Sequence, residues 1–165
     1  MGGRGGGGAR REGAGRLGLI DALPAGPVAV DTAVFIYLIE GHPEFAPMVR
    51  PLFEAADGGD VELVTSGVTL LEVLVVPLRA GDDALAARYQ ALLTRGRGLT
   101  MVALEPPLLR AAARLRATHG IRTPHALQLA AALARRCGCL VTNDRRLPSI
   151  PGLEVLQLSD MHGDG

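Results

Sequence analysis

Short aliphatic runs alternate with helix-length segments along the chain from Val28 onward. An uninterrupted aliphatic run of this length is typical of a strand that is buried on both faces. Strand and helix in alternation predict an α/β fold, with a central parallel sheet of four to five strands and helices on both faces. The candidate strands are residues 28–30, 62–66, 99–104, 139–143 and 153–158.

Six helix-length segments fill the remainder of this region. In the last of them, Thr123 is expected to cap the helix and Pro124 to be its first residue. Pro77 lies inside another segment, and because proline lacks an N–H group we expect that helix to kink or end nearby. The predicted helices are residues 32–40, 45–57, 67–78, 82–95, 106–119 and 124–136.

The N-terminal segment differs in composition from the rest of the chain. Residues 1–27 are rich in glycine and arginine and predict a flexible leader, followed by one domain over residues 28–160 and a tail over residues 161–165. The glycine run lacks the Gly-Lys-Ser/Thr ending of a phosphate-binding loop. No apolar stretch approaches the length of about 18 residues that a membrane span needs, so we expect a cytoplasmic protein.

The charge balance limits how the chain can bind nucleic acid. With 17 basic and 17 acidic residues, the formal net charge is zero, which excludes a broadly basic surface. Contact with a nucleic-acid backbone must then be local, and arginine clusters are the candidates for it. These are Arg114 with Arg116, Arg135 with Arg136, and Arg145 with Arg146, for which a solvated surface is the alternative. Cys137 and Cys139 are too few for a structural zinc site and are interpreted as small apolar residues.

Acidic residues lie near the ends of three predicted strands. Asp31 follows the run 28–30 directly, and Asp144 follows the run 139–143. Because the carboxyl ends of parallel strands meet at one edge of a sheet, we expect both there. Glu72 lies six residues beyond Ser66, in the second turn of the next helix and among apolar neighbours. Carboxylate oxygens are the ligands that hard divalent cations prefer, so these three acids are a candidate metal site.

Each carboxylate also has a structural interpretation. Asp31 suits the N-cap of a helix beginning at Thr32, Asp144 suits a tight turn, and Glu72 fits an exposed helix face. Spacing alone leaves the metal site and these structural roles open. A nucleotide-binding domain has the same strand and helix alternation, but it needs a glycine-rich turn where Asp31 follows the first strand.

Four motifs in fixed order carry a resemblance to a known family. The segments VAVDTAVFIYLIEGHP, VTSGVTLLEVLVVPLRAGD, RTPHALQLAAAL and CLVTNDRRL together resemble the PIN domain family, in particular VapC-type toxin ribonucleases. The resemblance spans residues 28–158 and implies a three-layer α/β sandwich with an acidic cluster that binds Mg²⁺ or Mn²⁺. It matches the catalytic acids with Asp31, Glu72 and Asp144, and the supporting polar positions with Ser66 and Asn143.

The same resemblance implies a function. It predicts a metal-dependent endoribonuclease, the toxin of a type II toxin–antitoxin pair, that hydrolyses RNA phosphodiester bonds. Its expected partners are an RNA substrate and a small antitoxin protein, with a homodimer as a further expectation. The candidate RNA-binding residues are Arg122, Arg145 and Arg146, chosen because they lie near the predicted site residues in the sequence. The alternative is a catalytically impaired PIN domain that serves as an RNA- or protein-binding module.

One position departs from the family pattern. Where the family has Asp after the Arg-Thr-Pro triplet, this chain has His125, which we include among the predicted metal ligands. At the start of a helix the dipole disfavours an imidazolium, so a neutral imidazole is expected. Such a group suits Mn²⁺, Zn²⁺ or Co²⁺ better than Mg²⁺. Three outcomes stay open: an altered metal preference, reduced or lost cleavage, or no effect.

Overall fold

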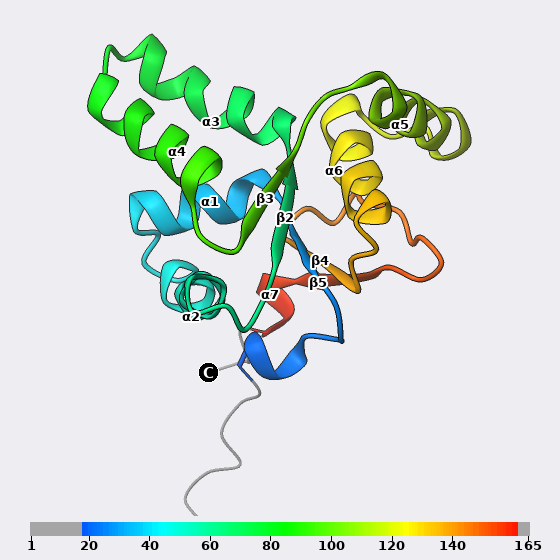
Figure 1. The fold of residues 1–165 in the computed structure, drawn as a ribbon, viewed down its shortest axis with the longest axis horizontal. Coiled ribbons are helices and arrows are strands. Elements are labelled where there is room, and N and C mark those ends of the chain that lie inside the picture. The colour runs from blue at the N-terminus through cyan, green and yellow to red at the C-terminus, as the bar shows by residue number, and fades with distance from the viewer. Residues whose placement is uncertain (1–17, 162–165) are drawn as a thin grey trace, which may run out of the picture.

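A five-stranded sheet, with every strand parallel to its neighbours, organises the computed structural model, which describes residues 18–161 (Figure 1). The order across the sheet is β3-β2-β1-β4-β5. The predicted parallel sheet and all five of its strands are therefore confirmed. Their bounds are β1 (Val28–Val30), β2 (Leu63–Ser66), β3 (Leu99–Val102), β4 (Cys139–Thr142) and β5 (Glu154–Gln157).

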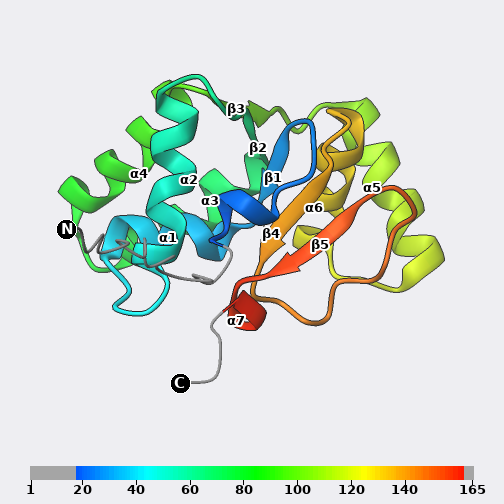
Figure 2. The same ribbon diagram turned by 90° about the horizontal axis from the view of Figure 1, so that it is seen from below.

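Helices cover both faces of the sheet, as Figures 1 and 2 show. One face carries α1 (Thr32–Glu40), α2 (Ala46–Asp57), α3 (Gly67–Arg79) and α4 (Asp83–Arg95). The other carries α5 (Pro106–His119) and α6 (Thr123–Ala134). Within β1, Val28 and Val30 pack toward the first group and Ala29 toward the second. Burial on both sides explains why β1 is aliphatic without alternation.

The folded region extends beyond the predicted domain boundary at residue 28. Residues 1–17 of the predicted leader lie outside the described part of the chain. A short 3₁₀ turn at Ile20–Ala22 precedes β1, and Leu19 is 5% exposed within the core on the α1 to α4 side. Burial of the apolar Leu19 side chain stabilises the fold, even though the segment around it is rich in glycine. A last short helix, α7 (Leu158–Met161), was also not predicted.

The helix bounds lie within two residues of their predictions. Helix α3 ends at Arg79, two residues after the buried Pro77, as the proline predicted. The predicted N-cap at Thr123 is wrong by one residue, because Thr123 is already helical and Arg122 is the cap residue, with no side-chain hydrogen bond. His125 nevertheless lies in the first turn of α6, as predicted.

The strand order creates a switch point between β1 and β4. From β1 the chain proceeds outward to β2 and β3, and it then returns to place β4 and β5 on the other side of β1. The connections that leave β1 and β4 therefore diverge, and ligands of open parallel sheets bind at such points. None of the helices within residues 18–161 has the length and apolar character of a membrane-spanning segment.

Candidate active site

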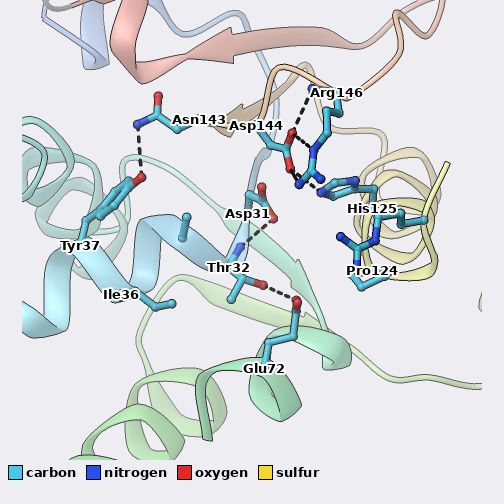
Figure 3. A pocket seen from close by; sticks show the side chains of 12 residues that line it. Asp31, Thr32, Ile36, Tyr37, Glu72, Pro124, His125, Asn143, Asp144 and Arg146 are labelled. Carbon is cyan, nitrogen blue, oxygen red and sulfur yellow. Dashed lines mark hydrogen bonds and ion pairs between the residues drawn. The ribbon is translucent and has the colours of Figure 1, made fainter. Parts of the chain in front are cut away.

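The four predicted metal ligands line one pocket at this switch point. Asp31 directly follows β1 and Asp144 lies two residues past β4, while Glu72 comes from α3 and His125 from α6. Figure 3 shows all four side chains around the same space. Residues more than 110 positions apart in the sequence are thus neighbours here, as the parallel sheet predicts.

Asp31 is both the N-cap of α1 and a wall of the pocket. Its backbone is extended, with φ −75° and ψ 158°, and its Oδ1 accepts a hydrogen bond from the Thr32 N–H at 2.8 Å. Its Oδ2 accepts from the Thr142 hydroxyl at 2.7 Å. The side chain is 9% exposed and is therefore held as an ordered acceptor. The capping role and the pocket position, which were alternatives at the sequence level, occur together.

Glu72 is held beside Asp31 by the same residue. It lies in the second turn of α3, whose N-cap Ser66 accepts from the Val68 N–H at 3.3 Å. The Thr32 hydroxyl donates to Glu72 Oε1 at 2.8 Å. Thr32 therefore binds one carboxylate through its N–H and the other through its hydroxyl, and in Figure 3 it lies between them. Both carboxylates face the pocket with fixed orientation.

Asp144 has a different environment, because Arg146 and His125 already bind it. Arg146 donates to it through Nη2 at 2.8 Å, through Nε at 3.0 Å and through its backbone N–H at 2.9 Å. His125 Nε2 lies 2.7 Å from its Oδ2. The hydrogen bonds from Arg146, with a smaller contribution from His125, hold the pKa of Asp144 well below its usual range. Asp144 is thus an anion, and each of its two carboxylate oxygens already accepts from a side chain of the protein.

The donor set fits a divalent cation held by two carboxylates. Hard cations of the Mg²⁺ type bind proteins through one or two carboxylates and keep several waters, and Asp31 with Glu72 supplies that pair. Within residues 18–161 no three or more His, Cys, Asp or Glu side chains are assembled as a ready set of ligands. Asp144 and His125 bind each other instead, so their role as metal ligands stays a prediction that requires this pair to open.

The two predicted supporting residues have structural contacts of their own. Ser66 is fully buried at the cap of α3 and does not line the pocket. Asn143 lines it, but its amide donates to the Tyr37 hydroxyl at 3.3 Å and its carbonyl accepts from the Ser159 N–H at 2.9 Å. Asn143 therefore ties α1 to α7 at the pocket margin.

The three candidate RNA-binding arginines separate in space. Arg122 and Arg146 line the pocket. Arg145 does not, because its guanidinium binds Ser159 and forms an ion pair with Asp160 in α7. Of the three, only Arg122 and Arg146 lie where they can contact a phosphate beside the acidic residues.

Sequence reasoning missed the buried polar residues behind the acids. Thr32, Thr69 and Gln128 form a hydrogen-bonded cluster beneath Glu72, and Gln128 is only 3% exposed. The sequence did carry one indication of this cluster. Gln128 is the single polar residue in the apolar segment ALQLAAAL, and a buried amide requires hydrogen-bond partners.

The Arg146 contact predicts a pH-dependent loss of stability on mutation. We expect Arg146→Gln to unfold at a lower urea concentration than the unaltered chain at pH 7. A carboxylate with a lowered pKa stabilises the fold above the unfolded-state value of about 4, and this contribution is lost as the pH falls below it. The difference should therefore shrink in acid. Arg114→Gln, an exposed change on α5, is the control, and a pH-independent difference would contradict the assignment.

Sequence comparison identifies one family. The family model for the PIN domain matches residues 28–153. No curated protein matches the chain significantly.

Solved structures share the fold at low sequence identity. A toxin–antitoxin complex from Klebsiella pneumoniae is 22% identical with a TM-score of 0.57, covering 76% of this chain and 94% of that one. VapBC2 from Rickettsia felis, bound to a DNA fragment from its promoter, is 18% identical with a TM-score of 0.59, covering 79% and 97%. VapC20 from Mycobacterium tuberculosis, a toxin that cleaves the sarcin-ricin loop, is 15% identical with a TM-score of 0.56, covering 68% and 86%.

Proposed function

Because the chain belongs to the PIN domain family, we propose that it is a metal-dependent endoribonuclease and the toxin of a toxin–antitoxin pair. The observation that carries this proposal is the pair of oriented carboxylates, Asp31 and Glu72, that Thr32 holds at the switch point of the sheet. Two arginines of the same pocket make it suitable for a substrate that carries phosphate.

In this proposal the pocket residues have different roles in phosphodiester hydrolysis. A divalent ion bound at such a site supplies a water of lowered pKa and offsets charge on the phosphate. Asp31 and Glu72 are the residues that would hold it, and their bonds to Thr32 fix their oxygens before the ion arrives. Arg122 has no ion pair with any described residue, so its guanidinium is available to donate to a phosphate oxygen.

An antitoxin partner fits an exposed apolar face of α3. Several large aliphatic side chains on this helix are more than 40% exposed, which is unusual for a surface without a partner. Glu72 lies on the same helix, so a protein bound there is close to the pocket. A second copy of the chain is the alternative occupant. The exposed residues are Leu71, Val75, Val76 and Leu78.

RNA cleavage by the purified chain tests the proposed activity. We expect single-stranded RNA to be cut in the presence of Mn²⁺ and to stay intact when EDTA removes the ion, because the ion is what lowers the pKa of the attacking water and offsets charge on the phosphate. Gel electrophoresis of end-labelled RNA gives the rate and the cleavage positions. Cleavage that persists undiminished in EDTA would refute metal dependence.

A second candidate function is a binding module with an impaired site. The observation that favours it is that His125 and Arg146 both bind the Asp144 carboxylate. While they do so, Asp144 is not available as a metal ligand. Such a protein binds RNA or a protein partner without cutting RNA in Mn²⁺. Binding measured by fluorescence anisotropy, with no cleavage at the same protein concentration, would support this candidate over the nuclease.

A further inference from the structure

A buried amide connects the far face of the sheet to the acidic pocket. Gln128 comes from α6 and is 3% exposed. Its Nε2 lies 2.6 Å from Thr69 Oγ1 and 3.3 Å from Thr32 Oγ1, and its Oε1 lies 3.2 Å from the Ser66 N–H. Thr32 in turn contacts Glu72. One side chain therefore reaches from α6 to the residue that holds both pocket carboxylates.

The chemistry of the donors and acceptors fixes the direction of these bonds. The Ser66 N–H only donates, so the Gln128 atom that faces it is the carbonyl Oε1 and the opposite atom is the NH₂ donor. A carboxylate only accepts, so the single proton of the Thr32 hydroxyl points to Glu72. Thr32 must then accept from Gln128 Nε2.

The neighbouring threonines offer Thr32 at most one other hydroxyl proton, that of Thr69. The Thr65 hydroxyl lies within reach of the Val30 carbonyl at 3.0 Å and the Gln128 carbonyl at 3.3 Å, rather than of Thr32. Thr69 Oγ1 lies 2.8 Å from Thr65 Oγ1 and 3.1 Å from Thr32 Oγ1, and either hydroxyl of each pair can be the donor. Thr69 has a single proton to share between these two neighbours, whereas the two protons of the Gln128 NH₂ group reach Thr69 and Thr32 together.

We propose that Gln128 is a positioning residue for the divalent-ion site, which it serves by holding the Thr32 hydroxyl as a donor to Glu72. The inference rests on the proposed function, in which Glu72 and Asp31 bind the ion. Gln128 touches neither the ion nor RNA and acts only through Thr32. Partners of this kind, which orient the ligands of a metal, typically change metal affinity by about 10- to 100-fold when they are removed.

Mn²⁺ affinity of four variants tests the proposal. Gln128→Met keeps the length of the side chain and removes both polar atoms, so we expect the Mn²⁺ dissociation constant to rise about tenfold. Thr32→Val should weaken binding similarly, and the double variant should bind no more weakly than Thr32→Val alone. Gln90→Met, an exposed change on α4, is the control and should bind Mn²⁺ like the unaltered chain. Calorimetry measures binding, and circular dichroism confirms the fold of each variant.

The outcomes separate this inference from the proposed function. If Gln128→Met is less stable but binds Mn²⁺ normally, or if its effect multiplies that of Thr32→Val, Gln128 has a structural role only and the inference is overturned while the nuclease stands. If the unaltered chain binds no Mn²⁺, the proposed function fails and the positioning role fails with it.

An NMR titration of the unaltered protein tests the same inference without relying on the correct folding of a variant. In ¹⁵N-labelled protein the side-chain amide resonance of Gln128 should shift as Mg²⁺ is added, because the ion pulls on Glu72 and hence on Thr32. The Gln90 amide is the internal reference. An unchanged Gln128 resonance at saturating Mg²⁺ would overturn the inference.

Discussion

We expect Asp31→Asn to lower the rate of RNA cleavage at saturating Mn²⁺ by about a thousandfold or more. The substitution removes the negative charge of one of the two oriented carboxylates and leaves an amide that binds hard cations poorly. A bound ion offsets several kcal/mol of transition-state charge, and about 4 kcal/mol corresponds to three orders of magnitude in rate. Single-turnover cleavage of labelled RNA measures the loss.

The fold should survive this change, which makes the rate interpretable. Asn is as good an N-cap as Asp, so the hydrogen bond from the Thr32 N–H is retained. Asp82→Asn is a matched control, since Asp82 caps α4 by accepting from the Leu85 N–H at 3.0 Å and does not line the pocket. It should cleave at the unaltered rate. Equal rates for Asp31→Asn and Asp82→Asn would remove Asp31 from the catalytic site.

His125→Asp has the second largest expected effect, and it raises activity. His125 Nε2 lies 2.7 Å from Asp144, so a carboxylate at this position repels Asp144 and adds an anion to the pocket. We expect Mn²⁺ to bind at least about tenfold more tightly, a gain of about 1.4 kcal/mol, and cleavage to increase with it. Without the ion the variant should unfold at a lower temperature, and Mn²⁺ should raise that temperature more than in the unaltered chain.

His125→Asn separates the added charge from the lost imidazole. This variant also breaks the contact with Asp144 but brings no anion. If removing the His125 contact from Asp144 is sufficient, both variants gain Mn²⁺ affinity, and if the added carboxylate matters, only His125→Asp does. Unchanged affinity and cleavage in both variants would show that His125 does not limit the site, which was one of the three outcomes that the sequence left open.

The sheet was predictable because its signal is local. Short runs rich in aliphatic residues are typical of buried strands, and β1, β2 and β4 are fully buried, while the edge strands β3 and β5 are partly exposed and carry polar residues as well. Helix α1 matches its predicted bounds because Asp31 caps its start and Gly41, with φ 67°, ends it. The burial of Leu19 was not predictable in this way, because the glycine-rich composition around it carries no periodic pattern.

The site was predictable only as far as the sheet determines it. The convergence of Asp31 and Asp144 follows from parallel strands that end at one edge. The binding of Asp144 by Arg146 and His125 depends on side-chain conformations and on a turn that no spacing rule specifies. The role of Gln128 depends on a contact with Thr32, 96 positions away, which only the packed structure reveals.

Calorimetric titration of the metal-free chain with Mn²⁺, beside Asp31→Asn, tests the central claim most directly. If acidic side chains at the carboxyl edge of the sheet hold the ion that RNA cleavage requires, the unaltered chain binds Mn²⁺ saturably, EDTA reverses the binding, and Asp31→Asn loses it. Equal binding by the two proteins, or no binding by either, would contradict the account.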